Sequence, residues 1–252
     1  MKKIIVTGVN GRMGRTTTEY ITNRDDCLVV AGVDKKAGIS GNFKIFASME
    51  KIDKEADVLI DFSHPEFINQ ILNFCIRKKL PAVICTTGFS DFQNKKILSA
   101  SSKIPIFLSE NMSIGINLMT RICKEMTRVL EQKFDIEIIE RHHNKKIDAP
   151  SGTALMLANA ISSMKKDKQK YVYDRHFHRN PRTKNEIGIS CVRGGSIIGD
   201  HEVIFAGDNE TLSVRHSAQS KEVFVAGAVN AALFICTKSP GLYTMSDLLE
   251  FV

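Results

Sequence analysis

A polar block in the middle of the chain carries residue types that transfer protons and bind anions. The residues from Glu140 to Ala154 read ERHHNKKIDAPSGTA. Histidine has an unperturbed pKa of about 6.5, and lysine can also exchange a proton near neutral pH when neighbouring charge lowers its pKa. The block could therefore be a solvated turn, a metal site or the reacting centre of an enzyme.

The end of the block offers an anion site. Ser151 is a plausible N-cap for a helix that begins near Gly152 and Thr153, where free N–H groups stabilise negative charge. Zinc is not expected, because strand neighbours such as His142 and His143 point to opposite faces. In addition, no cysteine or third histidine lies at ligand spacing.

The flanks of the block identify the elements that must position it. Asp135–Glu140 alternates like a strand, whereas Ile116–Gln132 and Thr153–Met164 have apolar residues at helical spacing. Glu186–Ser220 alternates with period two, which predicts a sheet covered on one side only, and the basic segment Lys165–Asn185 is expected to be an exposed loop. The open face of this sheet, either a ligand-site wall or solvated, is expected to carry Arg193, His201, Arg215 and His216.

The first 110 residues alternate short apolar runs with helical patterns, which predicts a parallel sheet with helices on both faces. The expected strands are Lys3–Thr7, Leu28–Val33, Val58–Asp61, Ala82–Cys85 and Pro105–Leu108. The expected helices are Gly11–Asn23, Pro65–Lys79 and, near the C-terminus, Glu222–Thr237. The fold class is therefore α/β, with a Rossmann-like parallel sheet domain over residues 1–113 and 222–252. A smaller α+β domain with an open mixed sheet is expected over residues 114–221.

A glycine turn follows the first strand. Gly8, Gly11 and Gly14 provide a tight turn and let the backbone approach a pyrophosphate at a helix start. Asp34, at the end of the second strand, suits an adenosine ribose, and Lys35 with Lys36 could neutralise a 2′-phosphate, so both NADH and NADPH are expected to be usable. The loops Cys85–Phe89 and Ser109–Ser113 follow later strands and are expected to flank the nicotinamide.

Composition and charge restrict the class of protein. The 252 residues are 43% hydrophobic and 25% charged, as in ordinary globular proteins, and no apolar run approaches the roughly 20 residues of a membrane span. The N-terminal sequence has no secretory pattern, and the six cysteines are scattered singly, so a cytoplasmic protein with reduced thiols is expected. The net charge of +7 is spread along the chain, which favours an acidic metabolite or a phosphate-bearing cofactor over nucleic acid.

Taken together, the motifs VNGRMGR, DFSHPE, TTGF, NMSIGIN, EIIERHHNKKIDAPSGTA and VRGGSIIGDHEVIF resemble those of the 4-hydroxy-tetrahydrodipicolinate (dihydrodipicolinate) reductase family. The resemblance extends from about Lys3 to Leu249 in the family's motif order. It implies NADH- or NADPH-dependent reduction of a cyclic dicarboxylic acid, with loss of water, in diaminopimelate and lysine biosynthesis. It also implies a homotetramer whose substrate domains pack together.

The resemblance assigns roles to individual residues. It implies that His142 and Lys146 are catalytic, and that either of them donates the proton. For substrate binding it implies His143, Ser151, Gly152 and Thr153. For the cofactor it implies Gly8, Val9, Asn10, Gly11, Arg12, Met13, Asp34, Lys35, Cys85, Thr86, Thr87, Ser109, Glu110, Asn111 and Met112.

Two other functions compete with this interpretation. A non-catalytic dinucleotide sensor could keep the fold and lose the chemistry, although His142 and Lys146 are both present. A dehydrogenase with a thiol nucleophile would depend on Cys85, which stands where the family commonly has glycine. The segment Arg175–Glu186 lacks the glycines usual in the family, and Asp34 replaces the common glutamate.

Overall fold

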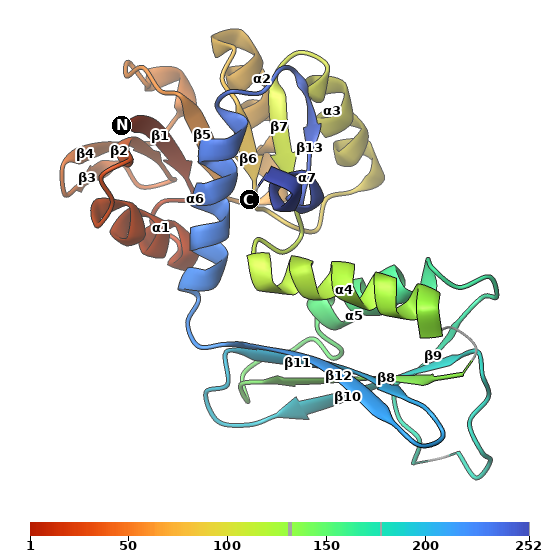
Figure 1. Cartoon of the computed structure of the whole chain (residues 1–252). Helices are drawn as coiled ribbons and strands as arrows, with labels where there is room; N and C mark the ends of the chain where they lie inside the picture. Colours follow the sequence, from red (N-terminus) through yellow and green to blue (C-terminus); the bar gives the residue numbers. More distant parts are fainter. Residues whose placement is uncertain (131–132, 177, 252) are drawn as a thin grey trace. The chain divides into compact units, whose positions relative to one another are not determined.

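Two units make up the chain in the computed structural model, which describes residues 1–130, 133–176 and 178–251 (Figure 1). Unit 1 comprises Met1–Ile114 and Lys221–Val252, and unit 2 comprises Gly115–Ser220.

Unit 1 is built on an eight-stranded sheet in the order β13-β7-β6-β5-β1-β2-β4-β3. Its pairings are parallel except that of β3 with β4. The carboxyl ends of the parallel strands therefore lie along one edge, and the strand order reverses direction at β1. The strands are β1 (Lys2–Thr7), β2 (Cys27–Val33), β3 (Gly38–Ser40), β4 (Phe43–Phe46), β5 (Val58–Asp61), β6 (Ala82–Ile84), β7 (Pro105–Leu108) and β13 (Gly241–Tyr243).

Helices cover both faces of this sheet, which explains why its strands are apolar throughout. Ile4 and Val6 of β1 pack in one buried cluster with α6, whereas Ile5 packs in a second cluster with α2 and α3. The helices are α1 (Arg12–Thr22), α2 (Ile68–Lys78), α3 (Asp91–Ser101), α6 (Glu222–Ile235), α7 (Met245–Phe251) and the 3₁₀ turns η1 (Met49–Lys51) and η2 (Pro65–Phe67).

Unit 2 is a mixed five-stranded sheet in the order β12-β11-β8-β10-β9. The central strand β8 pairs in parallel with β10 and antiparallel with β11. The elements are α4 (Ile114–Leu130), β8 (Asp135–His142), α5 (Gly152–Ser162), β9 (Lys170–Val172), β10 (Glu186–Arg193), β11 (Gly199–Ala206) and β12 (Thr211–Ala218). The fold class expected from the sequence is thus confirmed.

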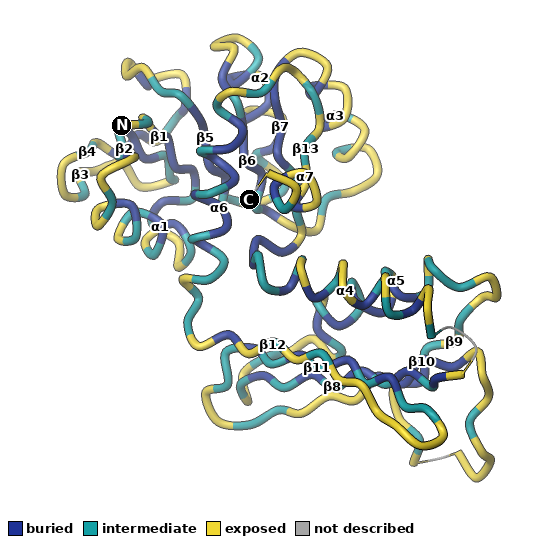
Figure 2. The backbone as a smooth tube through the Cα atoms, in the orientation of Figure 1, coloured by how far each residue is buried: buried dark blue, intermediate teal, exposed yellow. Residues whose placement is uncertain are grey.

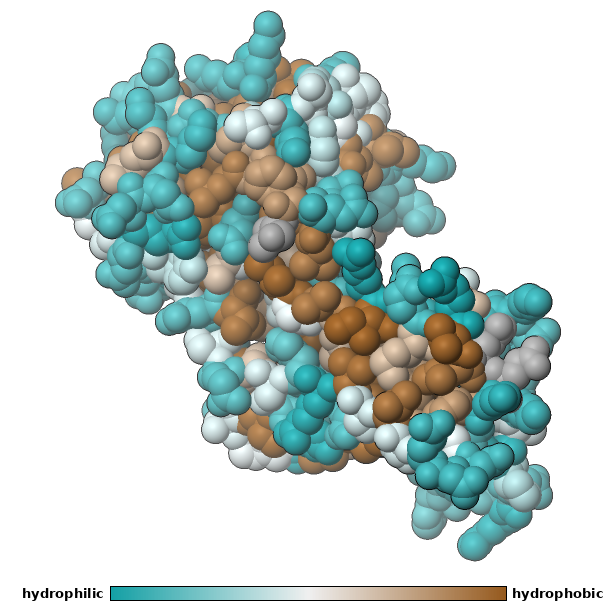
Figure 3. Space-filling model, viewed as in Figure 1, coloured by the Kyte–Doolittle hydropathy of each residue, from teal (hydrophilic) through white to brown (hydrophobic). Residues whose placement is uncertain are grey.

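One face of the unit 2 sheet is covered by helices and the other is not, as the alternating burial along β8 and β11 shows (Figure 2). Ile136 and Ile138 of β8 are buried in a cluster with Leu157 and Ile161 of α5. On the outward surface of α4, apolar side chains gather at exposed positions that include Leu118, Ile122 and Val129 (Figure 3).

The sequence patterns did not identify several short elements. The strands β3, β4, β9 and β13 were not expected; each has only three or four residues, too few to display a period. The segment Lys165–Asn185, expected to be loop throughout, contains β9, which pairs in parallel with β10. The helix α3 was also missed, although Ser90 and Gln93 form a capping box at its start. The expected end of α4, residues 131 and 132, lies outside the described residues.

Candidate functional site

The turn after β1 requires glycine at two positions. Gly8 has φ +67°, and a Cβ there would overlap the carbonyl group of Phe62. A Cβ at Gly14 would overlap the carbonyl oxygen of Gly8. Gly11, which has no side chain, is the N-cap of α1, so the first N–H groups of this helix have no side-chain acceptor there. The backbone is therefore open to an anion at the start of α1.

Asp34 lies beside this turn at the end of β2. Its Oδ2 accepts a hydrogen bond from the Asn10 backbone N–H at 2.9 Å, and the Asn10 side chain donates to the Lys36 carbonyl at 3.1 Å. The Lys35 ammonium lies 3.6 Å from a carboxylate oxygen of Glu66. Asp34, predicted for the ribose, and Lys35, predicted for a 2′-phosphate, thus lie beside the glycine turn, with Glu66 as an additional neighbour.

Two cavities, each of about 600 Å³, open at the carboxyl edge of the parallel sheet. The first is lined by Gly8, Gly11, Asp34 and Lys35, together with Ser48, Glu66 and Phe67. The second is lined by Met13, Cys85, Thr86, Thr87 and Gly88. Phe62, Ser63 and His64 line both. Most of the predicted cofactor residues therefore border adjoining spaces, while Val9 is buried in the core and Arg12 is exposed at the start of α1.

A buried hydroxyl in the second cavity has an unsatisfied hydrogen-bonding capacity. Thr86 is 8% exposed, and its Oγ1 has no hydrogen-bond partner within the described part of the chain. Such a group is a natural contact for a polar ligand. Next to it, burial and the nearby Asp61 raise the pKa of the Cys85 thiol well above its usual range, which argues against a thiolate nucleophile.

Hydrogen bonds at the loop Ser109–Met112 fix its conformation. The Ser109 hydroxyl donates to the Asn111 carbonyl at 2.8 Å, and the Asn111 side chain accepts from the Ser113 N–H at 2.9 Å. Met112 is buried, and its carbonyl lies so close to Gly227 of α6 that a Cβ there would overlap it. Glu110 is exposed.

Asp61, at the end of β5, was not singled out from the sequence. Its Oδ1 accepts hydrogen bonds from the Thr7 hydroxyl at 2.5 Å, the Ser63 hydroxyl at 2.5 Å and the Ser63 N–H at 3.0 Å. The buried carboxylate ties the end of β1 to the loop after β5, beneath both cavities. Its signal in the sequence was a charged residue that directly ends an apolar strand.

Glu140 is the buried centre of the polar block in unit 2. It is 0% exposed, and its two carboxylate oxygens accept from the His142 Nδ1 at 2.6 Å, from the Ser151 N–H at 3.0 Å, and from Arg193 at 2.7 and 2.6 Å. Burial acts to raise the pKa of this carboxyl, but the hydrogen bonds from Arg193 and His142 outweigh it and lower the pKa to about 2. Glu140 is therefore an ionised acceptor.

The two adjacent histidines lie at the end of β8: His142 is its last residue, and His143 is the first residue after it. His142 is on the helix-covered side with Glu140, because residues two apart in a strand share a face. Its ring packs closely on Gly199, where a Cβ would lie 3.1 Å from Nε2. His143 is half-buried, and its Nδ1 is without a hydrogen-bond partner among the described residues.

Ser151 caps α5, as the sequence predicted. Its Oγ accepts from the Ala154 N–H at 3.2 Å and lies 3.0 Å from Nε2 of His201. Gly152 is exposed and has open space around it, and Thr153 is half-buried. The start of α5 thus follows directly on Ser151, whose backbone N–H donates to Glu140, and the helix dipole there favours an anion.

Lys146 has a different environment from His142. Its ammonium donates to Asp148 at 2.7 Å, and this hydrogen bond holds the pKa of the Asp148 carboxyl below its usual value. The Lys146 N–H also donates to the His143 carbonyl at 3.1 Å, so the turn after β8 is closed by its own backbone.

The proposed open wall of the sheet was wrong in its composition. His201 is 3% exposed and contacts the His142 ring edge-on, with ring centroids 5.2 Å apart, and Arg193 reaches Glu140 on the same covered side. Arg215 is exposed and pairs with Asp200, and as the neighbour of His216 in β12 it must point to the opposite face. Side chains from consecutive strand positions cannot form one wall.

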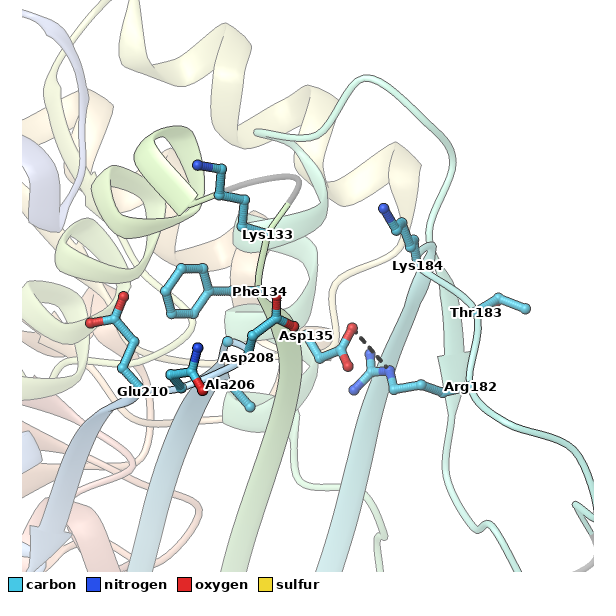
Figure 4. Close-up of a pocket in the computed structure, with 11 residues that line it drawn as sticks. Lys133, Phe134, Asp135, Arg182, Thr183, Lys184, Ala206, Asp208 and Glu210 are labelled. Atoms are coloured by element: carbon cyan, nitrogen blue, oxygen red, sulfur yellow. Dashed lines mark ion pairs between the residues drawn. The ribbon is translucent and has the colours of Figure 1, made fainter.

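A further cavity of about 930 Å³ lies where β8 begins, at the opposite end of this strand from His142 (Figure 4). Arg182 lies 3.5 Å from Asp135, donates to Glu137 at 2.6 Å and donates to the Glu186 carbonyl at 2.6 Å. These contacts fix part of the basic segment against β8 and the start of β10.

Two kinds of feature are not found within residues 1–130, 133–176 and 178–251. No group of three or more His, Cys, Asp or Glu side chains there could hold a metal ion. No helix in this part is long and apolar enough to cross a membrane.

Comparison with known families matches both parts of the chain. Residues 2–112 match the family described as "Dihydrodipicolinate reductase, N-terminus", and residues 115–249 match "Dihydrodipicolinate reductase, C-terminus". The two matches together cover nearly the whole chain.

Individual relatives are similar over their full length. The 4-hydroxy-tetrahydrodipicolinate reductase of Caldanaerobacter subterraneus subsp. tengcongensis is 48% identical, over 99% of this chain and 99% of its own. That of Clostridium tetani is 46% identical, over 99% and 98%. Among solved structures, the dipicolinate-bound dihydrodipicolinate reductase from Paenisporosarcina sp. TG-14 has a TM-score of 0.82 at 25% identity, and 97% of each chain is covered.

Proposed function

Because this chain belongs to the dihydrodipicolinate reductase family, we propose that it reduces 4-hydroxy-tetrahydrodipicolinate to tetrahydrodipicolinate with NADH or NADPH. The chain is accordingly an oxidoreductase of diaminopimelate and lysine biosynthesis. The reaction consumes one hydride and one proton, and the ring hydroxyl leaves as water. The observation that carries the assignment of residues is the contact of Glu140 with both His142 and the start of α5.

The substrate has two carboxylates, and unit 2 supplies groups of opposite charge. One carboxylate binds at the start of α5, where the N–H groups of Gly152 and Thr153 and the helix dipole favour an anion. His143 and Lys146, on the turn before this helix, are partners for the remaining negative charge. The dipicolinate bound in the Paenisporosarcina protein is a dicarboxylate of the same class.

The proton comes from His142 or Lys146, with His142 favoured. His142 is held by a buried carboxylate through Nδ1, and its Nε2 makes no contact with Glu140. Lys146 is paired with Asp148 instead of a buried carboxylate, and we assign to it the attraction of a substrate carboxylate. A general acid contributes typically about 10²- to 10⁴-fold to turnover.

The dinucleotide binds in unit 1 and supplies the hydride when bound. Asp34 accepts hydrogen bonds from the adenosine ribose. Thr86 contacts the nicotinamide end with its hydroxyl, which has no hydrogen-bond partner among the described residues. Lys35 and Lys36 neutralise a 2′-phosphate, so the site accepts NADPH as well as NADH. Residues 1–113 and 222–252 are thus the dinucleotide-binding part, and residues 114–221 bind the substrate and form the contacts of a homotetramer.

A non-catalytic sensor of the same fold is not favoured, because the full-length relatives at 42–48% identity are named as reductases. The deciding experiment measures oxidation of NADH and of NADPH with enzymatically generated hydroxy-tetrahydrodipicolinate. Turnover with either cofactor supports the proposal. Cofactor binding without oxidation would favour the sensor, and light scattering of the purified protein would test the tetramer separately.

A further inference from the structure

The buried carboxylate of Glu140 links three parts of unit 2. It lies in β8 and accepts hydrogen bonds from His142 in the same strand, from Ser151 at the start of α5 and from Arg193 at the end of β10. Arg193 also donates to the Asp148 carbonyl at 2.7 Å, so the loop before α5 is held by the same pair. Both carboxylate oxygens of Glu140 have two donors each, which satisfies the acceptor side of this buried ion pair, whereas Nε of Arg193 has no hydrogen-bond partner among the described residues.

This arrangement determines which ring nitrogen of His142 carries hydrogen. An ionised carboxylate only accepts, and each Glu140 oxygen already faces an arginine donor. In the 2.6 Å contact with Glu140, the hydrogen therefore belongs to Nδ1 of His142. The other nitrogen, Nε2, is left to exchange a proton with a reacting molecule.

We propose that Glu140 is a positioning residue of the reductase: it fixes His142 in the tautomer with hydrogen on Nδ1 and holds the start of α5 beside it. The proposal rests on the proposed function, and it adds a residue that acts through His142 and Ser151. The same carboxylate therefore orients both the proton donor His142 and the anion-binding start of α5.

The variant E140Q separates this role from a merely structural one. Its amide NH₂ must replace one of the two oxygens, and either position faces two donors. The Ser151 N–H cannot become an acceptor, whereas Nδ1 of His142 can. The amide therefore turns its NH₂ toward His142, and the imidazole hydrogen moves to Nε2.

The experiment combines ¹⁵N NMR of the histidine side chains with steady-state kinetics on the full chain. At a pH where His142 is neutral, its signals, assigned by their loss in H142Q, should show a protonated Nδ1 in the wild type and a protonated Nε2 in E140Q. In E140Q, kcat should fall about 10²-fold or more while NADH affinity changes little. The matched control is E202Q, which removes a carboxylate paired with Arg141 at 3.4 Å in the same sheet, and it should keep the wild-type tautomer and kcat.

Two results would overturn the proposal. One is a wild-type His142 with its hydrogen on Nε2, a measurement that decides the question even if E140Q does not fold. The other is an E140Q protein that loses thermal stability but keeps the wild-type kcat and tautomer, because an ion pair of structural value alone gives that outcome. If the wild type oxidises neither NADH nor NADPH, the proposed function fails, and the NMR result still decides the position of the hydrogen.

Discussion

The Ser151 hydroxyl oxygen and Nε2 of His201 lie 3.0 Å apart, and both side chains are almost fully buried. Ser151 caps α5 and His201 lies in β11, so this contact joins the helix start to the sheet. Burial, together with the nearby His142, lowers the pKa of His201 to about 4. Glu140 and Asp200 act in the opposite sense but do not outweigh these effects.

The lowered pKa of His201 predicts how the stability of the folded chain depends on pH. The unfolded chain binds a proton at His201 below about pH 6.5, whereas the folded chain does so only near pH 4, so stability is complete above pH 6.5 and declines as pH falls. The free energy of unfolding should drop by about 2 kcal/mol between pH 7 and 5 through this residue. Urea titrations at both pH values should show a smaller drop in H201Q. The exposed His178 offers the control H178Q, and an equal drop in H201Q and wild type would contradict the prediction.

Replacing either candidate proton donor by glutamine should affect kcat to a different extent. H142Q is expected to reduce kcat by about 10²- to 10⁴-fold, because the group held by Glu140 is lost. K146Q should act mainly on the KM of the substrate, since Lys146 is an attractive charge on a turn, and the exposed neighbour variant K145Q should change little. Near-normal turnover with unchanged pH dependence in H142Q would transfer the role to Lys146 or to water.

Thr86 should show opposite effects on stability and on cofactor binding. T86V removes a buried hydroxyl without a partner in the described residues, so thermal stability should be unchanged or higher. Affinity for NADH should fall about fivefold through the lost hydrogen bond. The control T127V removes a buried hydroxyl that donates to the Cys123 carbonyl at 2.7 Å in unit 2. T127V should lower thermal stability and leave NADH affinity unchanged. If T86V also lowers stability without changing NADH affinity, Thr86 does not contact the cofactor.

Asp34 should discriminate between the two cofactors. Its carboxylate accepts from Asn10 and borders the first cavity, where a ribose 2′-hydroxyl would donate to it. D34A should raise the KM of NADH about tenfold or more and that of NADPH less, because hydrogen bonds to a charged group are the stronger ones. The exposed Asp25 provides the control D25N. An equal increase in KM for both cofactors would show that Asp34 stabilises the glycine turn instead of binding the ribose.

Glu66 should limit the use of NADPH. Its carboxylate lies 3.6 Å from the Lys35 ammonium, the group that would meet the 2′-phosphate. Both side chains are exposed, so the effect is small: E66Q should raise kcat/KM for NADPH about twofold and leave that for NADH unchanged. E55Q, at another exposed position, is the control. A gain for both cofactors alike would show that Glu66 does not act through the 2′-phosphate.

The sequence determined those features that depend on neighbours along the chain. The apolar runs of unit 1 indicated buried parallel strands, and the glycine spacing indicated a tight turn at Gly8. Ser151 was identifiable as an N-cap. His142 is the last residue of β8, whereas His143, which the sequence placed in the same strand, follows it. Backbone periodicity and steric rules are local, so a single sequence displays them.

Only the tertiary structure decided which residues meet around Glu140. Arg193 is 53 residues from Glu140, and His201 is 50 residues from Ser151. They meet because β10 and β11 flank β8, an order that no period within one segment encodes. A strand's period fixes which side chains share a face, whereas strand pairing and register fix which of them come into contact.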